Sequence, residues 1–209
     1  MDEILKRLEL LHPKIIDLKL DRVKRLLRKL GNPEKSIPPV IHVAGTNGKG
    51  STIAMIKSGL QKSGFRTHTY TSPHLVSFNE RIEIGDKRIS EDALKEVLNE
   101  CEKVNNSQPI TFFEITTCAA FLAFSRASAD YTLVEVGLGG EFDATNVIQN
   151  PVASIITPIS FDHKEYLGSS IKKIAAAKAG IIKKNTPTII SNQSPIVKRI
   201  LDAKCVSNN

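Results

Sequence analysis

The sequence contains no tryptophan, and aromatic residues make up only 5% of its 209 residues. Aromatic side chains commonly provide the surfaces on which bases of single-stranded nucleic acid stack. The net charge of +7 therefore does not indicate a nucleic-acid partner by itself. Residues 166–201 hold seven basic residues and no acidic one. Solvated helix faces explain most of these, and attraction of small polyanions is the functional alternative.

Cysteine and long hydrophobic runs are also scarce. Cys101, Cys118 and Cys205 lie far apart and lack the spacing of metal ligands, so neither a disulfide framework nor a zinc site is indicated. No apolar run approaches 18 residues, and the N-terminus passes directly into an amphipathic pattern without a charged-then-apolar leader. With 41% hydrophobic and 24% charged residues, we expect a globular cytoplasmic protein with no membrane partner.

The order of hydrophobic patterns predicts an α/β protein. Residues 1–38 are expected to form two amphipathic helices and a proline-containing linker, and residues 39–209 a nucleotide-binding unit. Strands are expected near 40–44, 66–71, 131–136, 152–157 and 188–191, and helices near 49–63, 90–105, 112–127 and 170–182, with an irregular stretch at 72–89. Alternation of strands and helices predicts a doubly wound, mostly parallel sheet.

Residues 40–52 indicate a phosphate-binding loop. An apolar strand leads into a turn with three glycines, which permit positive φ and close backbone approach, and a helix begins directly behind it. Lys49 adds a positive charge. The spacing is not the common G-x-x-x-x-G-K-[ST] form, because Gly50 separates Lys49 from Ser51. A glycine-rich connection without a ligand is the alternative, but the lysine and hydroxyls favour binding of ATP.

Four further side chains stand near the predicted ends of strands or among small residues. Glu135 ends an apolar strand, where a buried carboxylate is costly unless it is paired or binds a metal such as Mg²⁺. His163 follows the next strand and is equally consistent with a ligand or a structural role. Ser72 by itself indicates an ordinary Ser-Pro turn, and Lys178 by itself an ordinary solvated lysine.

Five motifs then occur in order: Gly-Thr-Asn-Gly-Lys-Gly-Ser at 45–51, Thr-Ser-Pro-His-Leu at 71–75, Val-Glu-Val-Gly-Leu-Gly-Gly with Phe-Asp-Ala-Thr-Asn within 134–146, Asp-His with Tyr-Leu-Gly within 162–168, and Lys-Ala-Gly-Ile at 178–181. Together they closely resemble the bacterial folylpolyglutamate synthase / dihydrofolate synthase family of the Mur ligase superfamily. The resemblance extends from about residue 11 to about residue 190.

The resemblance implies an ATP-dependent acid–amino-acid ligase. Such an enzyme phosphorylates the carboxylate of dihydropteroate or of a folate, and glutamate then displaces the phosphate from this acyl phosphate. ATP and Mg²⁺ are the implied cofactors. The small-molecule substrates are dihydropteroate, folates and glutamate, and a monomer is expected. The carboxylate is a poor electrophile until phosphorylation provides a leaving group, so the chemistry agrees with a lysine and a metal beside the phosphates.

Matching motifs carry the family's site residues onto this chain. The resemblance implies ATP contacts at Thr46, Asn47, Gly48, Lys49, Gly50 and Ser51. It implies metal ligands at Ser72, Glu135 and His163, and catalytic roles for Lys49, His163 and Lys178, the last as a carbamylated lysine. It implies substrate contacts at Thr111, Phe112, Phe113, Glu114, Phe142, Asp143 and Ala144, with residues 14–18 bordering the same pocket.

The chain departs from the family pattern in three respects. Glu141 stands where an arginine is usual, and Ala177 replaces a common glutamate. Family members also continue into a C-terminal domain with adenine and glutamate contacts, so we expect an incomplete N-terminal ATPase portion whose own ligase activity is open. The alternatives are another Mur-type amino-acid ligase and a non-catalytic nucleotide- or pterin-binding remnant.

Overall fold

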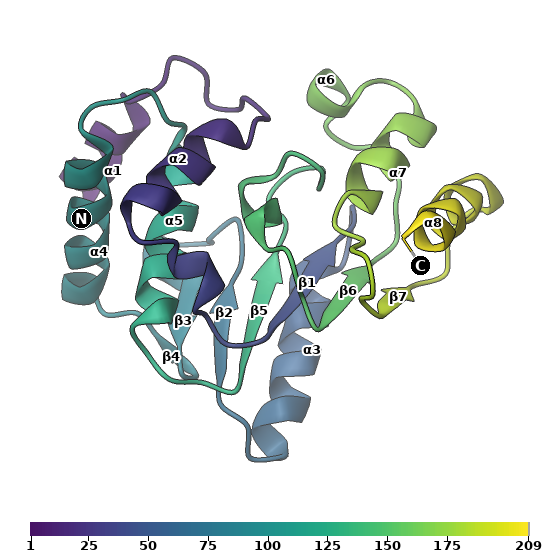
Figure 1. Ribbon diagram of the computed structural model, residues 1–209, viewed down its shortest axis with the longest axis horizontal. Helices are drawn as coiled ribbons and strands as arrows, with labels where there is room; N and C mark the ends of the chain where they lie inside the picture. The colour runs from purple at the N-terminus through teal and green to yellow at the C-terminus, as the bar shows by residue number, and fades with distance from the viewer. Residues whose placement is uncertain (209) are drawn as a thin grey trace.

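The computed structural model describes residues 1–208, so Asn209, the last residue of the predicted 39–209 unit, lies outside the described residues. The described strands form one seven-stranded sheet in the order β4-β3-β2-β5-β1-β6-β7 (Figure 1). The strands are β1 (Val40–Ala44), β2 (Thr67–Tyr70), β3 (Ile82–Ile84), β4 (Lys87–Arg88), β5 (Tyr131–Glu135), β6 (Ala153–Ile156) and β7 (Thr188–Ile190). The helices are α1 (Asp2–Glu9), α2 (Asp21–Lys29), α3 (Lys49–Lys62), α4 (Glu91–Asn105), α5 (Phe112–Ser125), α6 (Lys164–Leu167), α7 (Ile171–Ala179) and α8 (Pro195–Ser207).

The sheet is mostly parallel, which confirms the predicted α/β class. β1 pairs in parallel with β5 and β6, β2 pairs in parallel with β5, and β6 with β7. Among the described strands, the antiparallel pairs are β2 with β3 and β3 with β4, at one edge of the sheet. Parallel strands bring their carboxyl ends to one edge of the sheet, where ligands of such folds bind.

The prediction that residues 72–89 are irregular was wrong in part. This segment contains the 3₁₀ helix η2 (Phe78–Arg81) and the β3–β4 hairpin. Gly85 and Asp86 form the two-residue turn, both with positive φ, as hairpin turns of this length require. In strands of three and two residues, the alternation of apolar and polar side chains is too short to be recognised in the sequence. The sequence also gave no assignment for α8, which follows β7.

Helices cover the two faces of the sheet unequally. α1, α2, α4 and α5 share one hydrophobic core with the β2–β5 side of the sheet, and α7 and α8 continue this layer over β6 (Figure 1). α5 is buried along nearly its whole length, because it lies between the sheet and the outer helices. On the opposite face, α3 packs with Ile53 against Val43, Leu133 and Ile155. No helix within residues 1–208 is long and apolar enough to cross a membrane.

Candidate active site

The loop between β1 and α3 is held against the end of β6. A Cβ atom on Gly45 would lie 1.8 Å from Thr157 Oγ1, so only glycine fits this contact. The backbone N–H groups of Thr46 and Asn47 donate to the carbonyl of Pro158 at 3.0 and 3.3 Å. These contacts fix the loop that leads into the start of α3.

The N-terminus of α3 offers an open set of backbone donors. Gly48 precedes the helix with φ 81°, and no side chain accepts a hydrogen bond from the first turn. Gly48, Gly50 and Ser51 are exposed. Unpaired N–H groups and the positive end of the helix dipole make such a terminus suitable for a phosphate.

The side chains of Thr46 and Asn47 instead reach the segment after β6. Thr46 Oγ1 donates to the carbonyl of Ser160 at 3.1 Å, and Asn47 Nδ2 donates to Ser160 Oγ at 3.4 Å. Both residues therefore brace the loop in this structure. Their predicted contacts with ATP stay a prediction.

Lys49 and Glu135 form the charged centre of the site. Lys49 Nζ lies 3.8 Å from Glu135 Oε1, and the backbone N–H of Ser72 donates to Glu135 Oε2 at 3.3 Å. Glu135 is only 5% exposed. Burial raises the pKa of Glu135 above its ordinary value, against the opposing effects of Lys49 and the Ser72 N–H. The carboxylate is therefore short of positive charge, and an added cation would stabilise it.

Glu135 ends β5, Ser72 follows β2 by two residues, and His163 stands in the segment between β6 and α6. Ser72, His163 and Lys49 line the same cavity. His163 adopts φ 45° before α6, is partly exposed, and has Nε2 3.4 Å from Asp162 Oδ2. Within residues 1–208 no group of three His, Cys, Asp or Glu side chains gathers in a metal-binding arrangement. The predicted trio includes a serine hydroxyl, and its role as a metal site stays a prediction.

Lys178 is buried, contrary to the solvated lysine that its sequence surroundings indicate by themselves. It is 3% exposed, and its Nζ donates to the carbonyl of Gly45 at 2.8 Å. Burial, with a contribution from Lys49, lowers the pKa of Lys178 to about 8. Lys178 therefore connects α7 to the loop after β1 through this hydrogen bond. With a pKa of about 8, its amine is partly neutral near pH 8.

The two departures from the family pattern meet at one contact. The backbone N–H of Glu141 donates to the carbonyl of Ala177 at 2.8 Å. A Cβ atom on Gly180 would lie 2.4 Å from Glu141 Cα, so the 139–141 turn packs directly on the end of α7. The small residues around Lys178 are explained by this close packing.

A cavity of about 390 Å³ adjoins the charged centre. It is lined by all of the predicted substrate residues, namely Thr111, Phe112, Phe113, Glu114, Phe142, Asp143 and Ala144. Residues 15–18 also line it, from the segment that leads into α2. The aromatic and aliphatic lining beside Lys49 is suited to a planar, partly apolar ligand with an anionic end.

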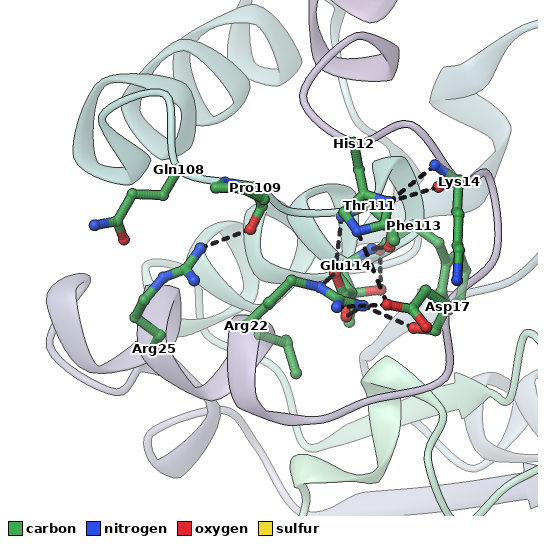
Figure 2. A network of polar contacts seen from close by, with 12 residues as sticks. His12, Lys14, Asp17, Arg22, Arg25, Gln108, Pro109, Thr111, Phe113 and Glu114 are labelled. Atoms are coloured by element: carbon green, nitrogen blue, oxygen red, sulfur yellow. Dashed lines mark hydrogen bonds and ion pairs between the residues drawn. The ribbon is translucent and has the colours of Figure 1, made fainter.

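Two of the predicted substrate residues hold the cavity wall together. Glu114 accepts hydrogen bonds from Arg22 Nε and Nη2, both at 2.9 Å, and from the backbone N–H of Thr111 at 2.8 Å (Figure 2). Thr111 and Glu114 form a capping box at the start of α5. Asp143 is 2% exposed and accepts from the N–H groups of Leu138 and Thr145 at 2.8 and 3.0 Å. Both carboxylates therefore have structural partners.

Sequence reasoning missed two arginines. Arg22 of α2 donates hydrogen bonds to Glu114 of α5 and to Asp17 in the segment before α2 (Figure 2). Arg81, at the end of η2, lines the cavity. On an amphipathic helix, Arg22 is indistinguishable from a solvated residue. The Thr111-x-x-Glu114 capping signature was the available signal for the start of α5. Nothing in the sequence marks Arg81.

Comparisons with known proteins agree with these motifs. The chain matches the family model described as the Mur ligase middle domain over residues 43–207. A Bacillus subtilis protein named dihydrofolate synthase/folylpolyglutamate synthase is 42% identical over 190 residues, which cover 87% of this chain and 44% of that protein.

Solved structures show the same similarity in three dimensions. E. coli FolC in complex with DHPP and ADP has a TM-score of 0.90 at 35% identity, covering 98% of this chain and 49% of that one. Mycobacterium tuberculosis folylpolyglutamate synthase complexed with ADP and AMPPCP has a TM-score of 0.86 at 40% identity, covering 99% and 49%. The chain thus spans about half the length of the curated relatives and solved structures that it matches.

Proposed function

We propose a function from the premise that this chain belongs to the Mur ligase middle-domain family. We infer that it supplies the ATP- and pterin-binding half of an ATP-dependent ligase that adds L-glutamate to dihydropteroate, to folates, or to both, through an acyl phosphate. The observation that carries this proposal is the position of Lys49. This residue stands where the proposed phosphate loop enters α3, and it also lines the proposed substrate cavity. Phosphoryl transfer from ATP to a bound carboxylate needs both ligands to meet at one such point.

The residues present fit a nucleotide and a divalent cation. The open N-terminus of α3 and Lys49 would hold the phosphates, and Ser72, Glu135 and His163 would hold Mg²⁺. The poorly compensated carboxylate of Glu135 supports a cation at this position. Bound Mg²⁺ would offset the charge of the phosphates and act as a Lewis acid on the transferring group. The ammonium group of Lys49, which lies 3.8 Å from Glu135 Oε1, would also offset the charge of the phosphates and donate hydrogen bonds to them.

The burial and the lowered pKa of Lys178 are suited to a lysine that is carbamylated. A neutral amine attacks CO₂ to give a carbamate and releases one proton, and a pKa of about 8 makes the neutral form accessible near neutral pH. The product is an anion buried beside the phosphate loop. Such an anion would orient the cation held by the neighbouring ligands, which is the role that the resemblance implies for this position.

The cavity fits a pteroate-like substrate. Phe112, Phe113 and Phe142 offer aromatic surface for a flat heterocycle, while Lys49 and Ser72 lie where a carboxylate would meet the phosphates. The relative from E. coli was solved with DHPP and ADP, which supports a pteroate-type ligand in this family. We further propose that the protein acts in the cytoplasm, as a monomer, without a nucleic-acid partner.

Binding of AMPPCP with Mg²⁺ to the 209-residue chain, measured by calorimetry, tests the nucleotide half of this proposal. We expect Lys49→Ala to weaken binding on the order of tenfold or more, because a cation is removed from beside the phosphates. Lys62→Ala is the matched control, since Lys62 lies in the last turn of the same helix. Equal affinity of wild type and Lys49→Ala would refute the role of Lys49, and absence of binding to wild type would refute the nucleotide site.

A further inference from the structure

Arg81 is a cation of the substrate cavity without an acidic partner in the described part of the chain. Lys49, the other cation lining the cavity, lies beside Glu135. The nearby carboxylates of Asp17 and Glu114 are both taken by Arg22. Arg81 forms no ion pair with any Asp or Glu within residues 1–208, and burial lowers its pKa below the ordinary value for arginine. An incompletely compensated cation is therefore held at the cavity wall.

Contacts on one edge of the guanidinium fix its position. Arg81 Nε donates to His74 Nδ1 at 2.9 Å, and the guanidinium carbon lies 5.0 Å from the centre of the Phe78 ring. Phe78 in turn packs edge-on against Phe112, which also lines the cavity. The side chain is thus oriented before any ligand binds, which reduces the entropy lost on binding.

The two terminal nitrogens of the guanidinium remain as free donors. Among residues 1–208, the hydrogen bond of the Arg81 side chain to protein uses Nε alone. The planar fork of Nη1 and Nη2 matches the two oxygens of a carboxylate. Keeping a desolvated cation unpaired is unfavourable, and an anion that enters the cavity relieves this cost.

We propose that Arg81 binds the carboxylate of the substrate that occupies this cavity and so selects pteroate-type acids over their neutral derivatives. The assignment rests on the proposed function and adds to it the residue that recognises the reacting group. Ser72 and Lys49 line the same cavity, so a carboxylate held at Arg81 lies in the compartment that the phosphate loop also faces. Arg81 then acts by binding and orienting the carboxylate, while Lys49 serves the phosphates.

Binding of an acid and of its neutral methyl ester, which differ by this charge and one methyl group, tests the proposal. The affinities of pteroate and of pteroate methyl ester are measured by calorimetry for the 209-residue chain and its variants. We expect wild type to favour pteroate by roughly tenfold or more, and Arg81→Gln to weaken pteroate on the order of 30-fold while changing ester binding about twofold at most. Arg88→Gln is the matched control, because Arg88 is an exposed arginine on β4 nearby in sequence; its affinities should equal those of wild type.

Each other outcome overturns a defined part of the argument. If Arg81→Gln weakens both ligands equally, the arginine contacts the neutral part of the ligand or supports the fold. If it changes neither affinity, Arg81 takes no part in recognition. Failure of wild type to bind either ligand would refute the proposed function together with this assignment.

Thermal unfolding separates recognition from a structural role. Arg81→Gln should have a Tm equal to or above that of wild type, since a partly buried cation without an acidic partner is removed. Arg81→Lys retains the charge but loses the fork, so its selectivity for pteroate should lie between those of wild type and Arg81→Gln. A lower Tm for Arg81→Gln, with both ligands weakened alike, would show that Arg81 only supports the wall.

Discussion

At the scale of the residue, Lys178 shows how burial changes a common side chain into an unusual one. Its side chain is 3% exposed, and its ammonium group donates a hydrogen bond to the carbonyl of Gly45. No carboxylate forms an ion pair with it within the described residues, and Lys49 adds repulsion. The protein therefore holds this lysine at a cost in stability, as is usual for groups kept for function.

This cost predicts a pH-dependent stability. In the unfolded chain the pKa of Lys178 is about 10.5, and in the folded protein about 8. Below pH 8, Lys178 is protonated in both the folded and the unfolded state, and the full cost of burying its charge is present. Between pH 8 and 10.5, only the unfolded state keeps this proton, so the free energy of unfolding rises with pH. Lys178→Met should therefore be more stable than wild type near pH 7, by up to about 3 kcal/mol, with a gain that shrinks above pH 8.

Urea denaturation between pH 6.5 and 9.5 in bicarbonate-free buffer provides the measurement. Lys172→Met, an exposed position on the same helix, should show no such pH dependence relative to wild type. If Lys178→Met is destabilised by the same amount at every pH, Lys178 is not held as a strained cation, and the argument for a partly neutral amine fails.

At the scale of the element, a largely buried arginine side chain joins α2 to α5. Arg22 is paired with Asp17 and Glu114, and the side chain of Glu114 is only 4% exposed (Figure 2). Burial alone would raise the pKa of Asp17, but Arg22 holds it below its ordinary value. The same glutamate caps α5, so one network sets both the start of α5 and the position of residues 15–18 at the cavity.

Breaking this network should be costly. Arg22→Met leaves the Glu114 carboxylate buried without its cation, which should lower the free energy of unfolding by about 3 kcal/mol. A double-mutant cycle with Glu114→Gln, which keeps the capping geometry, measures the coupling by urea denaturation. The exposed pair Arg7–Glu102 between α1 and α4 is the control and should show much weaker coupling than the Arg22–Glu114 pair. Similar coupling in the two pairs would contradict a special role for burial.

At the scale of the whole molecule, one edge of the sheet gathers the chemistry. Lys49 follows β1, Ser72 follows β2, the 136–143 turn follows β5, and His163 follows β6. The start of α5 and the segment before α2 complete the lining of the cavity. The relatives that share this architecture are about twice as long. The groups proposed to hold the phosphates and a pteroate-type acid all lie at this edge of the sheet.

A polypeptide of these 209 residues should consequently bind ligands without joining them. Amide formation requires the acyl phosphate and the amine to be held together, and loss of that proximity costs several kcal/mol of barrier, roughly a thousandfold or more in rate. Incorporation of labelled glutamate into dihydropteroate, compared with a full-length homologue, measures this. Turnover comparable to the homologue would show that the chain is a complete ligase, whereas absence of nucleotide and pteroate binding would favour a non-catalytic remnant.

The sequence by itself determined the class of fold, because strands such as 131–136 and helices such as 112–127 are long enough for their patterns to be recognised. It also marked the phosphate loop, since glycines and a lysine between a strand and a helix have a local physical meaning. It did not reveal the β3–β4 hairpin, whose strands are too short to show a period.

Only the tertiary structure decided which charges are paired. Lys178 and the surface lysines of α7 look alike in sequence, yet packing of the 139–141 turn removes only Lys178 from water. Glu114 and Arg22 are 92 residues apart, and Arg81 lines the cavity whereas the exposed Arg88 lies beside Glu80. Burial and pairing depend on contacts between distant segments, and those contacts turn ordinary charged residues into a candidate site.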